Sequence, residues 1–406
     1  MFISALDFKE KSIQVIRKTP EKFVEEGWKV DYIILRDNSI LDNYEYEKEI
    51  NPPGIKVFRL YLRFLWLMSV TRNYRILRRP IQKLSYTYGL FQIVFFVLLN
   101  KKKICNYQVV YGYEVQGVLA LRILRFLGLF NKALFVTRFQ GSFLYDYIIN
   151  RKILKLIGSL DDLIAFIVRA DITIITNDGT MADKAFKILN QKSQTKLRFW
   201  PNGSDFVSNS SNKLDDTNEN GSNKITFLTV SRLVNWKRVD RAIRLVSYLS
   251  KKIDCNLIIV GDGPAKNNLE TLVKELKVGT RVVFEGAVDA SNVQSYFSKA
   301  DFFLSFYEGS NVGNPLFEAI RNNKIVCTLS NGDTSNWIDH KNTGLIYDDF
   351  ESNIDNIITD ILFLISNTDS QIEIRNNIRK LEKLKLKTWE ERMDDEYREI
   401  IKLIEF

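Results

Sequence analysis

The sequence has 406 residues, of which 45% are hydrophobic, 12% aromatic and 26% charged. This is enough apolar material for two cores of ordinary size, and it excludes a disordered or fibrous protein. The three cysteines, Cys105, Cys255 and Cys327, are far apart and lack metal-ligand spacing, so they indicate a reducing compartment. Charges from Asp7 onward come before any signal-peptide apolar core could form, which favours the cytoplasm.

Apolar segments of strand length alternate with segments of helix length along the chain. The expected strands in the first half are 30–35, 55–60, 108–113, 134–139, 172–176 and 197–200. Those in the second half are 225–230, 256–260, 281–285, 302–306 and 325–329. Strands that are apolar throughout and alternate with helices are typical of parallel sheets covered on both faces. The pattern therefore predicts an α/β protein.

A polar segment divides this alternation. Residues 207–224 contain almost no apolar side chain and are expected to be a linker. We therefore expect an N-terminal domain over residues 1–206 and a C-terminal domain over residues 225–386.

The positive charge of the chain lies in its first half. The formal net charge is +9, and residues 1–200 hold thirty-two Lys and Arg against eighteen Asp and Glu. Between Glu49 and Glu114 there are eleven basic residues and no acidic one, interleaved with aromatic and aliphatic residues. The basic residues in 56–103 therefore predict contact with an anionic membrane surface. Nucleic-acid binding is not expected, because no helix-turn-helix, zinc-finger or stacking-sheet signature accompanies the charge.

The uncharged run 84–100 within this region has three interpretations. It is 17 residues long and includes Ser85, Thr87, Gly89 and Gln92, so it is short and polar beside a membrane span of about 20 apolar residues. A buried core helix of the first domain is favoured over an interfacial helix, and a transmembrane helix is the least favoured of the three.

A proline-started helix follows a glycine turn at residues 311–319. Asn314 fits the N-cap, Pro315 fits the first helical position, and Glu318 follows one turn later. Such a helix start presents N–H groups and a positive dipole end to an anion or a sugar hydroxyl. We expect a nucleotide-sugar site here, although any strand-turn-helix of an α/β protein can have this form.

Two cations follow the expected strand 225–230. Arg232 and Lys237 lie in the segment between this strand and the next helix, hence at the carboxyl edge of a sheet, where ligands of open α/β sheets bind. A guanidinium and an ammonium can together neutralise a diphosphate. The alternative is that both are solvated loop charges, but the two signatures in one half of the chain favour a phosphate site.

Over residues 225–347 the sequence resembles the retaining glycosyltransferases of family 4. The resemblance is carried by Ser231-Arg232-Leu233 with Lys237, and by residues 260–264, 284–286, 300–305, 318–319 and 342–345. It implies the GT-B fold, in which two Rossmann-like, doubly wound parallel-sheet domains face a cleft. It also implies that a last helix within residues 387–406 packs back on the first domain.

The resemblance further implies residue roles. Arg232 and Lys237 match the cations that bind the leaving diphosphate, and Glu318 matches the second glutamate of the family's pair, which holds the ribose hydroxyls. The first glutamate is displaced, because Glu308 lies ten positions before Glu318 where the family has eight, the position of Ser310. We favour a longer loop whose backbone N–H groups bind the sugar and β-phosphate; the alternative is that Ser310 and Asn311 contact the sugar. The expected donor-binding residues are Glu308, Gly309, Ser310, Asn311, Val312, Gly313, Asn314 and Gly261.

The first domain offers fewer signals. Many family members have a histidine there, but the one histidine of this chain is His340 in the second half, where we expect it on the surface. Arg138 and Glu114 lie at the carboxyl ends of expected strands. Arg138 is a candidate to stabilise phosphate charge and Glu114 to orient or deprotonate an acceptor hydroxyl, structural loop contacts being the alternative. Asp7, in the place of the family's glycine-rich acceptor loop, and Gln140 complete the acceptor-side candidates.

These observations predict a cytoplasmic, retaining glycosyltransferase of hexosyltransferase type, peripheral on the inner face of the cell membrane. It would transfer a sugar from a nucleoside-diphosphate sugar to a glycan acceptor, with a lipid-linked precursor of a cell-surface polysaccharide as the expected acceptor. No metal or other cofactor is expected, because no carboxylate cluster has the spacing of a divalent-metal cage. The alternatives are a sugar-nucleotide epimerase or hydrolase on the same fold, and a non-catalytic scaffold subunit that binds a nucleotide sugar.

Overall fold

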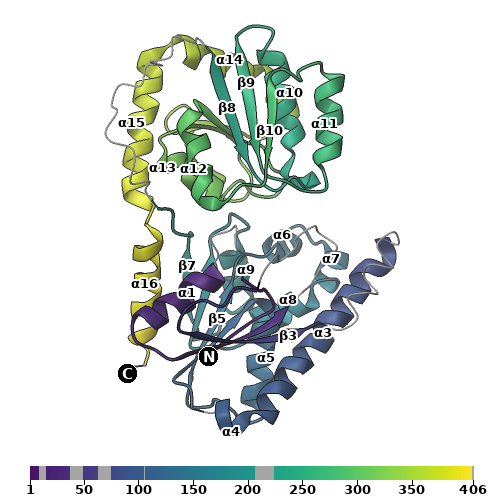
Figure 1. Cartoon of the computed structure of the whole chain (residues 1–406), viewed down its shortest axis with the longest axis vertical. Coiled ribbons are helices and arrows are strands. Elements are labelled where there is room, and N and C mark those ends of the chain that lie inside the picture. The colour runs from purple at the N-terminus through teal and green to yellow at the C-terminus, as the bar shows by residue number, and fades with distance from the viewer. Residues whose placement is uncertain (9–14, 37–48, 63–74, 105, 206–223, 405–406) are drawn as a thin grey trace. The chain divides into compact units, whose positions relative to one another are not determined.

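The computed structural model describes residues 1–8, 15–36, 49–62, 75–104, 106–205 and 224–404, with the backbone alone for residues 75–79. The chain forms two units: unit 1 is Met1–Pro201 with Glu390–Phe406, and unit 2 is Asn202–Trp389 (Figure 1). The expected linker, apart from Lys224, lies outside the described residues.

Unit 1 contains a seven-stranded parallel sheet in the order β3-β2-β1-β4-β5-β6-β7. Its strands are β1 (Phe2–Ser4), β2 (Val30–Arg36), β3 (Ile55–Tyr61), β4 (Val109–Tyr113), β5 (Leu134–Phe139), β6 (Ile172–Thr176) and β7 (Lys196–Trp200). Its helices are α1 (Val15–Glu25), α3 (Arg75–Leu99), α4 (Lys101–Ile104), α5 (Glu114–Phe126), α6 (Leu144–Ile149), α7 (Ile153–Ile157), α8 (Leu160–Phe166), α9 (Ala182–Leu189) and α16 (Trp389–Ile401). The sequence reading missed β1, which is only three residues long and too short for a pattern.

Unit 2 contains a six-stranded parallel sheet in the order β10-β9-β8-β11-β12-β13. Its strands are β8 (Ile225–Val230), β9 (Cys255–Val260), β10 (Val282–Gly286), β11 (Phe302–Ser305), β12 (Ile325–Leu329) and β13 (Gly344–Tyr347). Its helical elements are η2 (Asn235–Lys237), α10 (Val239–Leu249), α11 (Lys266–Glu275), α12 (Ala290–Lys299), α13 (Asn314–Arg321), η3 (Thr334–Asn336), α14 (Phe350–Ser366) and α15 (Thr368–Lys385). The expected strands of this half are all present, and β13 is an additional short edge strand.

The core of unit 2 follows directly from sequence periodicity. The apolar positions of α10, with spacings of three and four, are all buried against the sheet: Val239, Ala242, Ile243, Val246 and Leu249. In each unit the strand order reverses once, between β1 and β4 in unit 1 and between β8 and β11 in unit 2. Loops that leave neighbouring strands in opposite directions open a space at the carboxyl edge, which is where α/β sheets bind ligands.

The boundary between the units lies a few residues before the expected position at 206. The backbone of Ser204 is tied to unit 2, because its N–H donates to the Lys387 carbonyl at 2.9 Å and its carbonyl accepts from Arg321 Nε at 2.9 Å. These bonds place residues 202–205 with the second sheet. Composition alone did not reveal them, since the polar segment begins only after them.

The helix α3 packs against the sheet of unit 1 along one face. Ile93 and Val97 are fully buried, and a Cβ on Gly89 would meet the side chains of Leu35 and Leu62. By length and composition alone, residues Pro80–Leu99 would also suit a membrane span. One face of α3 therefore packs in the core of unit 1, but its outer face is exposed, so the helix is not fully buried as the favoured interpretation expected.

Candidate functional site

Two loops at the carboxyl edge of the unit 2 sheet are joined by a close backbone contact. Gly261 has φ of +136°, and a Cβ there would lie 1.8 Å from the Ser231 carbonyl oxygen, so no other residue fits. Leu233 N–H donates to the Asp262 carbonyl at 2.9 Å, and Ala265 N–H donates to the Leu233 carbonyl at 2.8 Å. Gly261 therefore positions the loop that carries Arg232.

Lys237 lies between two aromatic rings. Its Nζ is 4.1 Å from the ring centroid of Trp236 and 3.7 Å from that of Tyr307. Aromatic faces attract a cation, so the two rings hold the ammonium at the end of η2. Arg232 is exposed on the same loop. The structure thus places both predicted cations in the loop after β8.

Tyr307 connects this loop to the one that follows β11. Its hydroxyl donates to the Val230 carbonyl at 3.1 Å, its N–H donates to Asn311 Oδ1 at 2.9 Å, and burial raises the pKa of the phenol to about 12. The residue therefore stays neutral and rigid beside Lys237. Sequence reasoning missed it, although its place two residues after the buried strand β11 was a usable signal.

The side chain of Asn311 is engaged by groups at the ends of β11 and β12 and in the loop between β11 and α13. Its Oδ1 accepts from Ser305 Oγ at 2.8 Å and from Tyr307 N–H, and its Nδ2 donates to the Leu329 carbonyl at 3.2 Å. Ser310 is buried and its Oγ accepts from Val312 N–H at 3.1 Å. The alternative interpretation, in which the Asn311 side chain contacts the donor sugar, is therefore not supported by this structure. The Val312 N–H, expected to face the donor, is likewise already bonded.

The helix α13 begins one residue earlier than expected. The Gly313 carbonyl accepts from Leu316 N–H at 3.0 Å and from Phe317 N–H at 3.2 Å, so Gly313 is the N-cap and Asn314 the first helical residue. The expected N-cap role of Asn314 is wrong, and its Oδ1 instead accepts from Asn202 Nδ2 at 3.0 Å. Gly309 precedes this helix start, and it is half-buried in the same loop.

Glu318 lies in the second turn of α13 and is partly buried. Among the described residues its carboxylate has no hydrogen-bond or ion-pair partner, and burial raises its pKa to about 7. A half-buried carboxyl group without a partner is costly to ionise and is typical of a ligand-binding position. Its charge also acts on the phenol of Tyr307, so the two groups lie near each other.

Glu308 is engaged by Arg238. Its Oε1 lies 3.0 Å from Arg238 Nη1, and its N–H donates to the Trp236 carbonyl at 3.0 Å. Arg238 has φ of +44°, a conformation that costs a non-glycine residue on the order of 1 kcal/mol, and it also pairs with Asp240 and Glu351. Glu308 therefore ties the loop after β11 to the loop after β8.

Two of the acceptor-side candidates in unit 1 are structural. Asp7 is buried and pairs with Arg59, Nε to Oδ2 at 3.0 Å. Arg138 is buried in an ion pair with Glu396 of α16, and Tyr111 donates to the same carboxylate at 2.5 Å. Burial alone would raise the pKa of Glu396, but Arg138 and Arg392 lower it to about 2. The expected phosphate role of Arg138 is wrong, because its guanidinium fastens α16 to the sheet.

Glu114 and Gln140 lie together at the carboxyl edge of the unit 1 sheet. Glu114 has φ of +53° at the start of α5, and its Oε1 accepts from Gln140 N–H at 2.8 Å. Burial raises the pKa of Glu114 to about 7, and the neighbouring carboxylates of Asp162 and Asp178 act in the same direction. Glu114, a half-buried carboxyl group with a strained backbone at a sheet edge, remains an acceptor-side candidate together with Gln140.

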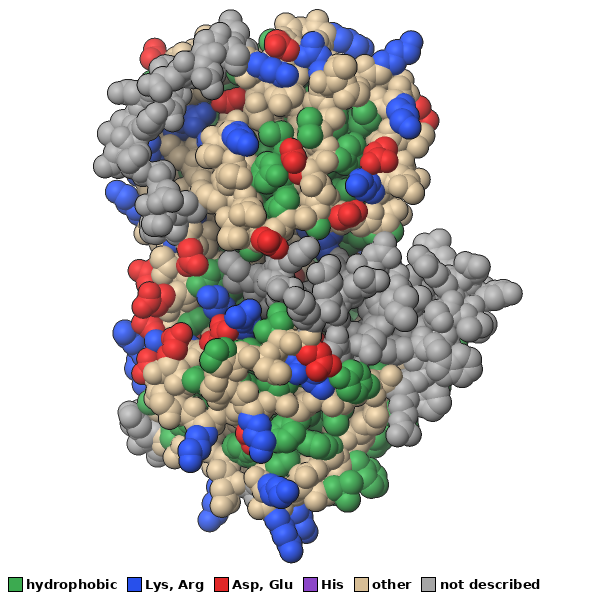
Figure 2. Space-filling view, in the orientation of Figure 1, with side chains coloured by type: hydrophobic (Ala, Val, Ile, Leu, Met, Phe, Trp, Pro, Cys, Tyr) green, Lys and Arg blue, Asp and Glu red, His purple; other side chains and the backbone are tan. Residues whose placement is uncertain are grey.

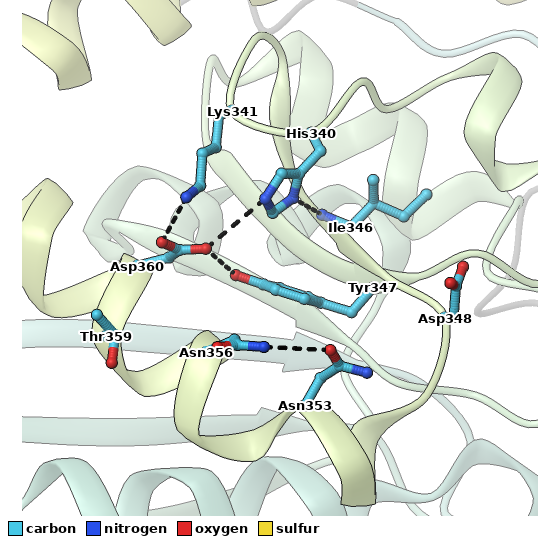
Figure 3. Close-up of a pocket in the computed structure, with 9 residues that line it drawn as sticks. All are labelled: His340, Lys341, Ile346, Tyr347, Asp348, Asn353, Asn356, Thr359 and Asp360. Carbon is cyan, nitrogen blue, oxygen red and sulfur yellow. Dashed lines mark hydrogen bonds and ion pairs between the residues drawn. The ribbon is translucent and has the colours of Figure 1, made fainter.

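A polar pocket of about 380 Å³ lies on another part of unit 2 (Figure 3). Asp360 lies in its wall, accepting from Tyr347 at 2.8 Å and pairing with Lys341 at 2.7 Å. His340 is exposed beside them, as expected, and none of the predicted site residues lines this pocket. In the part of the chain that the structure describes, no three His, Cys, Asp or Glu side chains are grouped to hold a metal ion.

Residues 210–381 match the family glycosyl transferases group 1. Alpha-monoglucosyldiacylglycerol synthase of Streptococcus pneumoniae is 28% identical over 123 residues, which are 30% of this chain and 28% of that protein. N-acetylgalactosamine-N,N'-diacetylbacillosaminyl-diphospho-undecaprenol 4-alpha-N-acetylgalactosaminyltransferase of Campylobacter jejuni is 33% identical over 105 residues, 25% of this chain and 27% of that protein. The chain thus matches less than a third of the length of these relatives.

Solved structures resemble the chain over nearly its whole length. Sucrose-phosphate synthase from Thermosynechococcus elongatus has a TM-score of 0.70 at 17% identity, with 98% of both chains covered. HepE of Anabaena, in complex with UDP and glucose, has a TM-score of 0.68 at 14% identity, covering 99% of this chain and 98% of that one. At these identities the likeness shows the fold alone. The fold is GT-B, as the sequence resemblance implied.

Proposed function

We propose that the chain transfers a sugar from a nucleoside-diphosphate sugar to an acceptor, because residues 210–381 match the family glycosyl transferases group 1. One observation carries the proposal. Lys237, held by two rings, and Glu318, without a protein partner among the described residues, both lie beside Tyr307, where the strand order of unit 2 reverses. This combination suits a ligand that carries phosphates at one end and vicinal hydroxyls at the other.

The proposed roles follow from charge. When the glycosidic bond breaks, negative charge grows on the departing diphosphate, and preorganised cations stabilise it more than water does. Lys237 and Arg232 would supply this stabilisation, and the first N–H groups of α13 would add to it. Glu318 would accept hydrogen bonds from the two ribose hydroxyls, which favour its ionised form. No metal or other cofactor is part of the proposal.

The acceptor is proposed to be a lipid-linked glycan, and the reaction to proceed with retention at the transferred sugar. The names of two relatives contain a diacylglycerol and a diphospho-undecaprenol. We further propose a role in cell-surface polysaccharide synthesis, at the cytoplasmic face of the membrane. Glu114, with its raised pKa, would orient the acceptor hydroxyl or accept its proton.

The exposed cations of the basic stretch 56–103 support this location. Lys56, Lys83 and Lys101–Lys103 are exposed on unit 1. Arg59 does not contribute, because it is paired with Asp7, and the charge of Lys83 is partly neutralised by Asp161. The remaining arginines of the stretch lie outside the described side chains.

The test is a screen of radiolabelled nucleoside-diphosphate sugars, with and without a lipid extract. Sugar transfer that depends on the extract supports the proposal, and its loss in Lys237→Ala assigns it to this site. Free sugar or an epimer formed without an acceptor would show that the protein is a hydrolase or an epimerase instead. Donor binding without any turnover would leave a scaffold subunit.

A further inference from the structure

The outer face of α3 is apolar and exposed. Leu84, Phe91 and Phe95 are 67%, 53% and 65% exposed, whereas Ile93 and Val97 on the opposite face are fully buried. Residues 84, 91 and 95 are spaced by seven and four positions, so they share one side of the helix. Helices on the surface of a soluble protein usually present polar side chains there. This face of α3 is therefore suited to an apolar surrounding.

A second exposed apolar surface lies on α7 and α8. It consists of residues that are 65%, 86%, 57%, 50% and 50% exposed, which we call the α7–α8 ridge: Ile153, Leu154, Ile157, Leu160 and Ile164. Single exposed aliphatic residues are common, but a group of this density marks an interaction surface. The composition and charge of this segment did not predict an exposed apolar surface.

The two surfaces are neighbours. Lys83 of α3 pairs with Asp161 of α8 at 2.5 Å, so α3 and α8 approach each other at these residues, and α5 packs against both helices. The helix α7 leads directly into α8 (Figure 1). Figure 2 shows hydrophobic side chains gathered on the part of unit 1 where α3 and α5 run. The outer face of α3 and the α7–α8 ridge therefore belong to one region of unit 1.

The charges around this region indicate what covers it. Residues 80–104 contain four lysines and no carboxylate, and Arg151 and Lys155 are exposed beside Leu154. The carboxylates Asp146 and Asp161 are each paired with a lysine, and Asp162 of α8 is half-buried near Lys83, so residues 80–104 and 146–164 together keep a net positive charge. A second copy of the chain would bring two surfaces of the same positive sign together, which opposes association. An anionic lipid surface attracts these cations, and lysine stems can lie along apolar groups with the ammonium among head groups.

We propose that the α7–α8 ridge inserts into the head-group region of an anionic bilayer while the outer face of α3 lies in the interface. The inference rests on the membrane location proposed above, and it assigns the anchoring contact to residues 153–164, outside the basic stretch that the sequence indicated. The mode is that of an interfacial helix, in which apolar side chains enter the bilayer and cations remain at its surface.

The test is flotation of the full-length protein with vesicles of phosphatidylcholine alone or with phosphatidylglycerol added. The triple variant Ile153→Ser, Leu154→Ser, Ile157→Ser removes apolar groups that are already exposed, so it should fold normally. The matched control changes three exposed apolar residues of unit 2, Phe363, Ile372 and Leu384, to Ser. We expect the protein to float only with anionic vesicles, the triple variant to bind at least tenfold less, and the control to bind as the wild type does.

Contrary outcomes are distinguishable. If the triple variant binds anionic vesicles as the wild type does, the proposed insertion of the α7–α8 ridge is wrong but the proposed membrane location stands. If the wild type binds no vesicle, both proposals are wrong. Retention after an alkaline carbonate wash would indicate a spanning α3 instead. If sedimentation shows that the wild type is a dimer without lipid and that the triple variant is a monomer, the α7–α8 ridge would instead be a contact between two copies of the chain. Sugar transfer to a soluble acceptor is a separate readout and should be unchanged in the triple variant.

Discussion

The carboxyl group of Glu318 should make the protein less stable as pH rises, and Glu318→Gln should remove this loss. Burial raises its pKa in the folded protein from 4.5 to about 7. An acid whose pKa is raised by folding stabilises the fold fully only below its unfolded pKa, and this contribution is lost as pH rises through the folded pKa. A shift of this size corresponds to about 3 kcal/mol, and partial contact with solvent lowers the expected effect to roughly 2 kcal/mol.

The assay is urea unfolding of wild type and Glu318→Gln at about pH 5 and about pH 8, followed by fluorescence and circular dichroism. The stability of the variant relative to wild type should increase by roughly 2 kcal/mol between the two pH values, because glutamine does not ionise. Glu275→Gln, at an exposed position of α11 in the same unit, is the control and should show no such change. If the free energy of unfolding of Glu318→Gln differs from that of wild type by the same amount at both pH values, the reasoning is refuted, since the carboxyl group would then be solvated. The variant should also bind the donor more weakly, so that it gains stability and loses function.

Three further predictions concern charged groups. Lys237→Ala and Arg232→Ala should each lower kcat/KM at least a hundredfold, since loss of one preorganised donor to developing charge costs about 2.7 to 4 kcal/mol; activity within threefold of wild type would contradict the donor site. Glu308→Gln should weaken donor binding, measured by calorimetry, less than Glu318→Gln does, because the Glu308 carboxylate is engaged by Arg238. A double-mutant cycle on the half-exposed pair Arg238–Glu308 should give a coupling free energy of about 0.5 to 1 kcal/mol in urea unfolding. A coupling of zero would show that this pair does not hold the two loops together. Glu396→Gln should destabilise the fold by about 3 to 5 kcal/mol near neutral pH by leaving Arg138 buried without its countercharge. Because the pKa of Glu396 is depressed to about 2, its contribution is present above about 4.5 and is lost as pH falls toward 2, so the variant and wild type should converge in acid.

The sequence by itself determined the α/β class of both units and the positions of the loops that follow β8 and β11. A strand buried on both faces must be apolar throughout, so the strands of both units except β1 and β13 could be located from the sequence pattern. The spacing of apolar residues in α10 likewise determined its buried face. Arg232 and Lys237 could be placed at the sheet edge because the carboxyl end of a parallel strand is a local property of the chain. Glu318 was singled out by its place in a proline-started helix and by the family resemblance. Family resemblance added the order in which these signals occur.

Tertiary structure decided which of the charged and polar candidates are engaged within the protein. Asp7 follows β1 and Arg138 lies near the carboxyl end of β5, but each meets a countercharge from a segment far away in sequence, Arg59 for Asp7 and Glu396 for Arg138. Burial makes such a pair obligatory, since an isolated charge inside a protein is too costly to keep. No local pattern shows whether a partner will arrive.

The same reason applies to the aromatic, amide and apolar groups that the sequence did not reveal. Tyr307 belongs to the candidate site because η2 brings Lys237 to its ring. Asn311 does not, because its side-chain amide is hydrogen-bonded to Ser305 and Leu329. The exposure of the α7–α8 ridge is also a tertiary property, since an apolar helical segment has the same sequence pattern whether it faces a core or an outer surface. Local sequence sets which groups a segment can offer, and the packing of distant segments sets which of them remain available to a ligand or a membrane.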